Sequence, residues 1–337
     1  MNGMPGGIRE MARGAVRYLD IDRSAPKLGW YGGDMIKAVY WLVWLGLYAG
    51  MVHPASRAHT LILGKVSTNP QKHYRQLKPL VDYVAERMQD LGIQAGDVRL
   101  VPNERELARL LREGKVDWMT DSVFPALFYQ ESAGAEIILK RWKKGVPSYR
   151  SVFITRADAP IHELADLKGK VLVFEDPGST TAFFWPAVEL LRRGYVLQQV
   201  AAGQRPERQS IGYRFTSSEI NISMQVAEGK AAAGVYSDLD WEDREHTPAR
   251  VRARLRIFHR TRPLPRMLEL VRGDWHEKLR FRLRQILLQL HLDPKGAKVL
   301  KAFQKSRRFE ALSTEDWDMI RQARRLFVRF HEFLLSQ

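Results

Sequence analysis

From residue 60 onward, hydrophobic and polar positions follow two patterns, one typical of β-strands and one typical of α-helices. Short apolar runs fit buried strands, and the longer segments between them fit amphipathic helices. The clearest helical stripe consists of Leu77, Leu80, Val81, Val84, Met88 and Leu91. The predicted elements are a strand over 60–66, a helix through 77–91, a strand over 97–101, a helix over 103–114 and a strand over 115–119. Strands and helices that alternate with short loops predict a mostly parallel α/β sheet.

A second unit of the same kind begins near residue 149. Its predicted elements are strands over 149–155, 170–174 and 231–236 and helices over 182–193 and 220–230. Segments 107–121 and 220–238 share one plan, which is a helix, Gly-Lys, a short strand and an acidic loop. This repetition predicts two similar α/β lobes. From Trp275 the chain is basic and amphipathic, and we expect helices that cover a lobe.

The run Ser179-Thr180-Thr181 stands where the strand 170–174 turns into a predicted helix. Small hydroxyl residues at such a position cap a helix. They also leave first-turn N–H groups unpaired at the positive end of the helix dipole. The run is therefore either an ordinary cap or an anion-binding site.

The amino-acid composition excludes several classes of site and function. The chain has no Cys, which excludes disulfides, zinc–thiolate sites and Cys nucleophiles. Its net charge of +16 is scattered without an aromatic-interleaved basic stripe, so we expect no nucleic-acid partner. It has no His-Glu-x-x-His, Gly-x-Ser-x-Gly or phosphate-loop motif, so we expect no enzyme activity, no metal and no cofactor.

The N-terminal part predicts export. Residues 38–52 form an uncharged apolar run between Lys37 and a small-residue stretch that ends at Ala58. This is typical of a signal peptide over residues 35–58, cleaved after Ala58. Translation from Met35 would make residues 1–34 a non-native extension. The alternative is an uncleaved membrane anchor.

The chain from about residue 61 to 327 resembles the phosphate/phosphite/phosphonate-binding proteins of ABC importers. No single motif is decisive, but their order and spacing together are specific. The matching positions are Tyr74, 79–83, 113–117, 149–151, 164–170, 179–181, Pro186, 293–297, Phe309 and 316–321.

This resemblance implies a two-lobed, type II periplasmic-binding-protein fold. Lobe 1 would comprise residues 59–148 plus 256–337, lobe 2 would comprise residues 149–255, and the C-terminal helices would pack on lobe 1. A small oxyanion, such as a phosphonate, phosphite or phosphate ester, would bind between the lobes. Ser179, Thr180 and Thr181 would bind its oxygens, and Tyr74, Tyr149 and Ser151 would line the same cleft.

The chain also departs from the family pattern. Asp121-Ser122 stands where the family often has a small pair, and Ser218 stands where phosphonate-binding members commonly have a His. Asp238 follows a strand that lacks the family's Asp. We therefore expect Asp121, Ser122, Ser218 and Asp238 near the ligand, which would suit a ligand that carries an amine or a protonated oxyanion.

The predicted function is a monomeric, periplasmic solute-binding protein that delivers its ligand to an ABC transporter permease. The alternative is a sensor of the same fold that signals to a membrane kinase or cyclase. An uncleaved anchor over residues 38–52 would favour the sensor.

Overall fold

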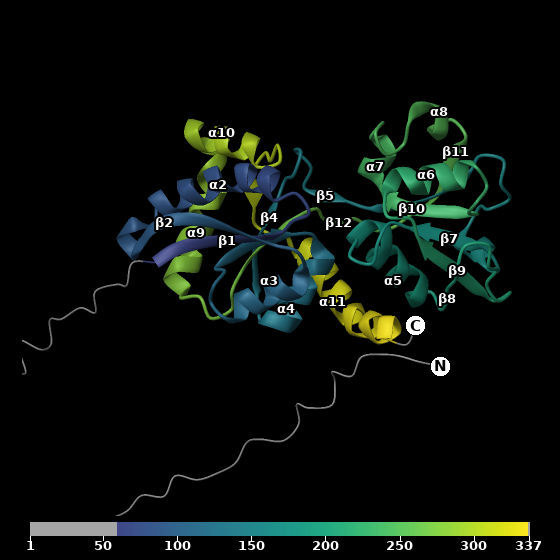
Figure 1. Cartoon of the computed structure of the whole chain (residues 1–337), viewed down its shortest axis with the longest axis horizontal. Coiled ribbons are helices and arrows are strands. Elements are labelled where there is room, and N and C mark those ends of the chain that lie inside the picture. The colour runs from purple at the N-terminus through teal and green to yellow at the C-terminus, as the bar shows by residue number, and fades with distance from the viewer. Residues whose placement is uncertain (1–58, 336–337) are drawn as a thin grey trace, which may run out of the picture. The chain divides into compact units, whose positions relative to one another are not determined.

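A computed structural model describes residues 59–335. The predicted signal peptide, its alternative as an anchor and the predicted extension over residues 1–34 lie outside the described residues. Within the part described, no helix is both long and apolar enough to cross a membrane. Two six-stranded sheets, each packed against helices, form the two predicted α/β lobes (Figure 1).

The first sheet has the strand order β14-β4-β13-β3-β1-β2. Its strands are β1 (His59–Val66), β2 (Ile93–Val101), β3 (Trp118–Asp121), β4 (Glu136–Arg141), β13 (Leu268–Val271) and β14 (Phe309–Glu310). β1 is parallel to β2 and β3, whereas β13 is antiparallel to β3 and β4. The carboxyl ends of β1 and β3 therefore lie at the same edge of the sheet.

The helices of the first lobe begin where the sequence places capping residues. Asn69 and Asn103 accept hydrogen bonds from the backbone of Lys72 and Glu106. The helices of this lobe are α2 (Pro70–Glu86), η1 (Gln89–Leu91), α3 (Glu104–Arg112), α4 (Val123–Ala133), α9 (Glu277–Gln289), η4 (Leu290–Leu292) and α10 (Pro294–Ala302). As predicted, the apolar face of α2 is buried, and it shares a core with α9 and α10.

The second sheet has the strand order β11-β6-β10-β7-β9-β8, with β7 parallel to β9 and β10. Its strands are β6 (Ser151–Arg156), β7 (Val171–Phe174), β8 (Val196–Gln199), β9 (Ser210–Phe215), β10 (Ala233–Ser237) and β11 (Leu255–Arg260). Its helices are η2 (Leu164–Leu167), the π-helical turn η3 (Thr180–Phe184), α5 (Trp185–Arg192), α6 (Glu219–Ala227), α7 (Asp238–Glu242) and α8 (Ala249–Arg252). The predicted helix over 182–193 is thus a π turn followed by α5.

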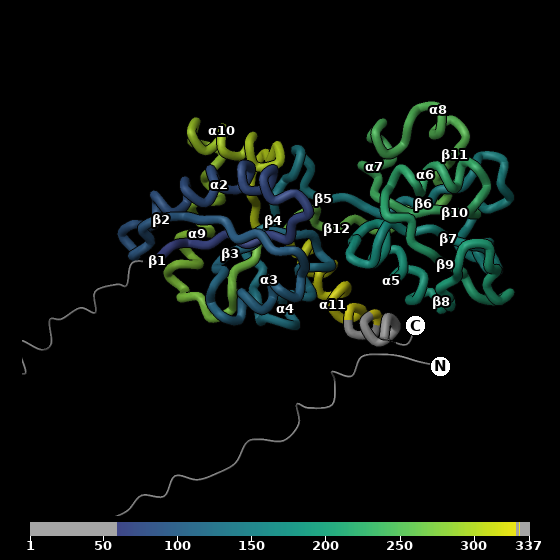
Figure 2. The backbone as a smooth tube through the Cα atoms, in the orientation of Figure 1, coloured from purple at the N-terminus to yellow at the C-terminus, as the bar shows by residue number. Residues whose placement is uncertain are grey.

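Two short strands connect the lobes. β5 (Ser148–Tyr149) leads from the first sheet to the second, and β12 (Leu264–Pro265) leads back. They pair antiparallel with each other, and Figure 2 shows them between the two sheets. The predicted lobe boundary at residue 149 lies at β5. The boundary at residue 256 falls inside β11, which pairs with β6 as far as Arg260, so the chain returns to the first lobe later than that boundary.

The C-terminal helix α11 (Thr314–Leu335) contacts both lobes, whereas we expected all C-terminal helices to pack on the first. Phe327 and Phe330 lie against Phe124 of α4 and Phe184 of η3. Phe124 and Phe184 also stack on each other, with ring centroids 4.5 Å apart. An aromatic cluster therefore joins α11 to one helix from each lobe.

A buried ion pair lies at the centre of the first sheet. Arg141 of β4 and Glu269 of β13 are both fully buried, with Nε and Oε1 3.0 Å apart. Glu269 also accepts hydrogen bonds from Trp118 Nε1 and Thr120 Oγ1 of β3, both at 2.8 Å. The guanidinium donates further bonds to Ser306, Thr120 and Gln304. Side-chain hydrogen bonds therefore tie together three neighbouring strands, and they satisfy charges that would be costly to bury alone.

Glu269→Gln should lower the free energy of unfolding by about 3–5 kcal/mol, because Arg141 would keep a buried charge without a counter-ion. Urea unfolding followed by circular dichroism measures the effect. Glu136→Gln is the matched control, since Glu136 pairs with Arg280 at the surface and should cost less than about 1 kcal/mol. Equal unfolding midpoints for the two variants would contradict the role of the buried pair.

Candidate ligand-binding site

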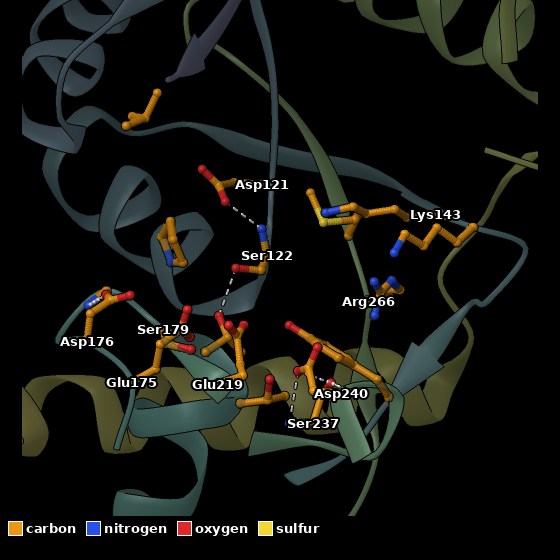
Figure 3. A pocket seen from close by; sticks show the side chains of 18 of the residues that line it. Asp121, Ser122, Lys143, Glu175, Asp176, Ser179, Glu219, Ser237, Asp240 and Arg266 are labelled. Atoms are coloured by element: carbon orange, nitrogen blue, oxygen red, sulfur yellow. Dashed lines mark hydrogen bonds between the residues drawn. The ribbon is translucent and has the colours of Figure 1, made fainter. Parts of the chain in front are cut away.

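A cavity of about 500 Å³ lies where the carboxyl ends of the parallel strands in both lobes meet. Residues that follow β1 and β3 line it from the first lobe, and residues that follow β7, β9 and β10 line it from the second. Open α/β sheets bind ligands at this edge, because the loops there carry helix N-termini and are free of sheet pairing. The cavity is therefore the candidate ligand site (Figure 3).

Six of the ten residues predicted for the site line this cavity. They are Asp121, Ser122, Tyr149, Ser179, Thr180 and Thr181. The first two come from the loop that opens α4, Tyr149 comes from the connecting strand β5, and the last three form the turn into η3. The fold thus brings together three chain segments that are distant in sequence.

The hydroxyl of Thr180 joins the two lobes across the cavity. Thr180 Oγ1 donates to Ser122 Oγ at 2.8 Å and accepts from the N–H of Phe124 at 3.0 Å. Ser122 is the N-cap of α4, but its own side chain makes no capping hydrogen bond. A residue of the second lobe therefore caps a helix of the first lobe.

The Ser179–Thr181 turn has the two features that its sequence predicts, namely a helix cap and first-turn N–H groups without a partner in the helix. Ser179 Oγ accepts from the N–H of Ala182 at 3.2 Å, which is an ordinary helix cap. The N–H groups of Thr180 and Thr181 belong to the first turn of η3, so the helix offers them no carbonyl partner. The phenol of Tyr149 lies beside these residues, hydrogen-bonded to Thr180 and Thr181. Capping and anion binding are therefore compatible here.

The other four predicted residues do not line the cavity. Tyr74 is 41% exposed on α2, and its hydroxyl lies 3.4 Å from Asp97. Ser218 caps α6 by accepting from the N–H of Asn221. Asp238, the first residue of α7, accepts from the N–H of Arg150. Ser151 is fully buried, and its hydroxyl donates to the carbonyl of Thr181 at 2.7 Å, so it supports the turn from behind.

The structure adds an acidic wall that sequence reasoning did not find. Its members from the second lobe are Glu175, Asp176, Glu219 and Asp240. Burial and the nearby Glu219 raise the pKa of Glu175 to about 8. Ser218 and Asp238 are close in sequence to Glu219 and Asp240, so the predicted positions miss cavity residues by one and two places. Helix geometry decides which side chain of a turn faces the cavity, and the sequence alone does not show it.

His246 lies on the acidic wall, where it forms an ion pair with Asp240. Its Nδ1 lies 2.7 Å from Asp240 Oδ1, and this hydrogen bond raises the pKa of His246 to about 9. Glu219, Asp240 and His246 could together offer ligand atoms to a metal ion, because these atoms lie within 4.8 Å of one another. A protonated imidazole has no lone pair for a metal, so the geometry favours a salt bridge at neutral pH.

The first lobe and the connecting strands contribute a basic wall. Its members are Lys65, Lys143, Lys144 and Arg266. Burial, reinforced by Arg141 and Arg266, lowers the pKa of Lys143 to about 7. Burial raises the pKa of Asp121, although Lys65 and Lys143 oppose this. Lys65 lies at the end of β1 and the other three cations lie in two loops, so no local sequence pattern predicts that they come together.

Two α/β lobes with a polar cavity between the carboxyl ends of their strands define a type II periplasmic binding protein. PhnD1 from Prochlorococcus marinus, solved with methylphosphonate, has this fold, with a TM-score of 0.55 at 17% identity over 79% of this chain and 97% of that chain. Residues 65–317 match the family described as "ABC transporter, phosphonate, periplasmic substrate-binding protein", and the chain belongs to that family.

Two relatives are more similar in sequence. XAC2383 from Xanthomonas citri, solved with chloride and with ATP, is 34% identical in the chloride structure over 81% of this chain and 99% of that chain, with a TM-score of 0.75. The phosphate-import protein PhnD of Mycolicibacterium smegmatis is 33% identical over 95 residues. That match spans 28% of this chain and 29% of the relative.

Replacement of His246 should lower stability in a pH-dependent way. A folded-state pKa of about 9 means that the ion pair contributes fully below the ordinary value of 6.5, and the contribution is lost as the pH rises through 9. His246→Gln should therefore cost about 1 kcal/mol at pH 6, because the pair is partly exposed, and almost nothing at pH 10. Urea unfolding at both pH values measures the difference. A cost that is the same at pH 6 and pH 10 would contradict the assignment, and the exposed His162→Gln controls for the loss of an imidazole.

Proposed function

We propose that this protein captures a small phosphorus oxyanion between its lobes and delivers it to the permease of an ABC importer. The observation that carries the proposal is the Thr180–Thr181 turn, where two hydroxyls and two first-turn N–H groups line a cavity between the lobes. Such donors bind oxyanions well, because each hydrogen bond to a charged acceptor is strong and the helix dipole adds to it. On binding, the hydroxyls of Ser122 and Thr180 would exchange their mutual hydrogen bond for bonds to the ligand.

The acidic wall indicates that the ligand also carries a positive charge. Asp176 and Glu219 line the same cavity as the oxyanion turn, whereas Asp240 is paired with His246 and the raised pKa of Glu175, about 8, keeps that side chain largely protonated at neutral pH. A ligand that was purely anionic would be repelled by these carboxylates. An aminoalkylphosphonate satisfies both features, because its ammonium group would pair with the carboxylates while its phosphonate occupies the turn.

Membership of this family supports a periplasmic location and a permease partner. A membrane-bound receptor could recognise the liganded arrangement of the lobes, which is how ligand binding would be coupled to transport. We propose that the protein acts as a monomer and does not convert its ligand. The family is one of transport components, so it lends no support to the alternative of a sensor.

A thermal-shift screen of the purified protein tests this function. The compounds are phosphate, phosphite, sulfate, methylphosphonate, 2-aminoethylphosphonate and ATP, the last because XAC2383 has been solved with it. We expect the largest increase in melting temperature with 2-aminoethylphosphonate, because a ligand that binds only the folded state stabilises it by mass action. Unchanged melting temperatures with every phosphorus compound would contradict the proposal.

Thr180→Val should weaken the binding of 2-aminoethylphosphonate by about 1–3 kcal/mol, since it removes the hydroxyl and keeps the side-chain shape. Isothermal titration calorimetry measures the change in affinity. Ser218→Ala is the matched control, because it removes a helix cap outside the cavity. It should lower stability by about 1 kcal/mol and leave the affinity unchanged. An unaltered affinity in Thr180→Val would place the oxyanion elsewhere in the cavity.

A further inference from the structure

The cavity has opposite charges on two sides. The charged lining residues from the first lobe and the connecting strands are four bases and two acids, namely Lys65, Lys143, Lys144, Arg266, Glu104 and Asp121. The charged lining residues from the second lobe are four carboxylates and His246. Figure 3 shows Lys143 and Arg266 on one side of the pocket and Glu175, Asp176 and Ser179 on the other. The ammonium group of the proposed ligand would fit the acidic wall. None of the ligand groups proposed so far would fit the basic wall.

Among the described residues, Lys143 and Arg266 have acidic neighbours but no direct ion-pair partner: Asp121 lies near Lys143, and Asp240 and Asp238 lie near Arg266. Among residues 59–335, neither forms an ion pair with a described carboxylate. The Nε of Arg266 is buried and has no hydrogen-bond partner among those residues. Burial, the charge of Arg141 and then the charge of Arg266 lower the pKa of Lys143 to about 7. Partly buried cations that repel each other are costly, and an anion placed between them would remove the cost.

This basic pair is distinct from the oxyanion turn. Tyr149 lies between the two, with its hydroxyl on Thr180 and Thr181 and its ring 5.2 Å from the guanidinium of Arg266. The ring and the guanidinium also restrict each other's orientation, because a cation over an aromatic face is attracted to it. A phosphorus oxyanion at the turn would therefore leave room beside Arg266 for another group of the same ligand.

We propose that Lys143 and Arg266 form a second anion-binding position, which selects a ligand carrying a carboxylate in addition to its phosphorus oxyanion and its amine. This inference rests on the proposed function. A carboxylate suits the position better than a second phosphoryl group, because Arg binds carboxylates with a planar pair of donors. Asp121 also lies near Lys143 and opposes a doubly charged group. The ligand class is a phosphono amino acid or a phosphorylated amino acid.

Two compounds that differ by one carboxylate test the inference. Isothermal titration calorimetry of the wild-type protein should show 2-amino-3-phosphonopropionate binding at least tenfold more tightly than 2-aminoethylphosphonate. Lys143→Gln and Arg266→Gln should each weaken the binding of 2-amino-3-phosphonopropionate by a much larger factor than that of 2-aminoethylphosphonate, so that most of this advantage is lost. O-Phosphoserine shows whether the ester is preferred to the phosphonate.

The controls separate this position from the general charge of the protein and from the oxyanion turn. Lys168→Gln removes a cation that is exposed outside the cavity and should leave both affinities unchanged. Thr180→Val should weaken both compounds equally. Equal wild-type affinities for the two compounds would overturn the second position alone. Equal losses for both compounds in Lys143→Gln and Arg266→Gln would also overturn it, since the cations would then serve one shared oxyanion. Binding of neither compound would overturn this inference, and the thermal-shift screen with the other phosphorus compounds then decides whether the proposed function fails as well.

Discussion

The buried pair of Arg141 and Glu269 is the constraint on which the ligand site of the first lobe depends. Its hydrogen bonds link β3, β4 and β13, and each of these strands continues within three residues into a part of the cavity wall. The cavity residues concerned are Asp121, Lys143 and Arg266. A buried ion pair adds little net stability, but it disfavours alternative strand registers that would leave either charge alone. The same interaction therefore fixes the spacing of groups that line the cavity.

The second lobe positions its groups differently. Parallel strands β7, β9 and β10 end at one edge, and each is followed by a helix or turn whose first residues face the cavity. Because helix starts attract small hydroxyl and acidic residues for capping, this edge collects both hydrogen-bond donors and carboxylates. The first lobe and the connecting strands instead contribute cations from the end of β1 and from two loops. The two kinds of connection thus account for the opposite charges of the two walls.

Local patterns made the fold and one part of the site predictable. Ser179–Thr181 could be identified because the strand before it and the helix after it are consecutive in sequence. The positions of Tyr74 and Asp238 depend on which side of a helix faces the cavity, and the structure places both away from it. The basic wall could not be predicted, because Lys143 and Arg266 are brought together by the pairing of β4 with β13 and of β5 with β12. The part of α11 that contacts the second lobe likewise depends on tertiary packing.

The pairing of β5 with β12 links ligand binding to movement between the lobes. The two strands form the short ribbon that joins the lobes, and this ribbon ends at Tyr149 on one strand and next to Arg266 on the other. A twist between the lobes deforms this ribbon, and Tyr149 and Arg266 at its ends also line the cavity. A ligand that bound both Tyr149 and Arg266 would bridge the two ends of the ribbon. It would therefore restrict bending of the ribbon directly.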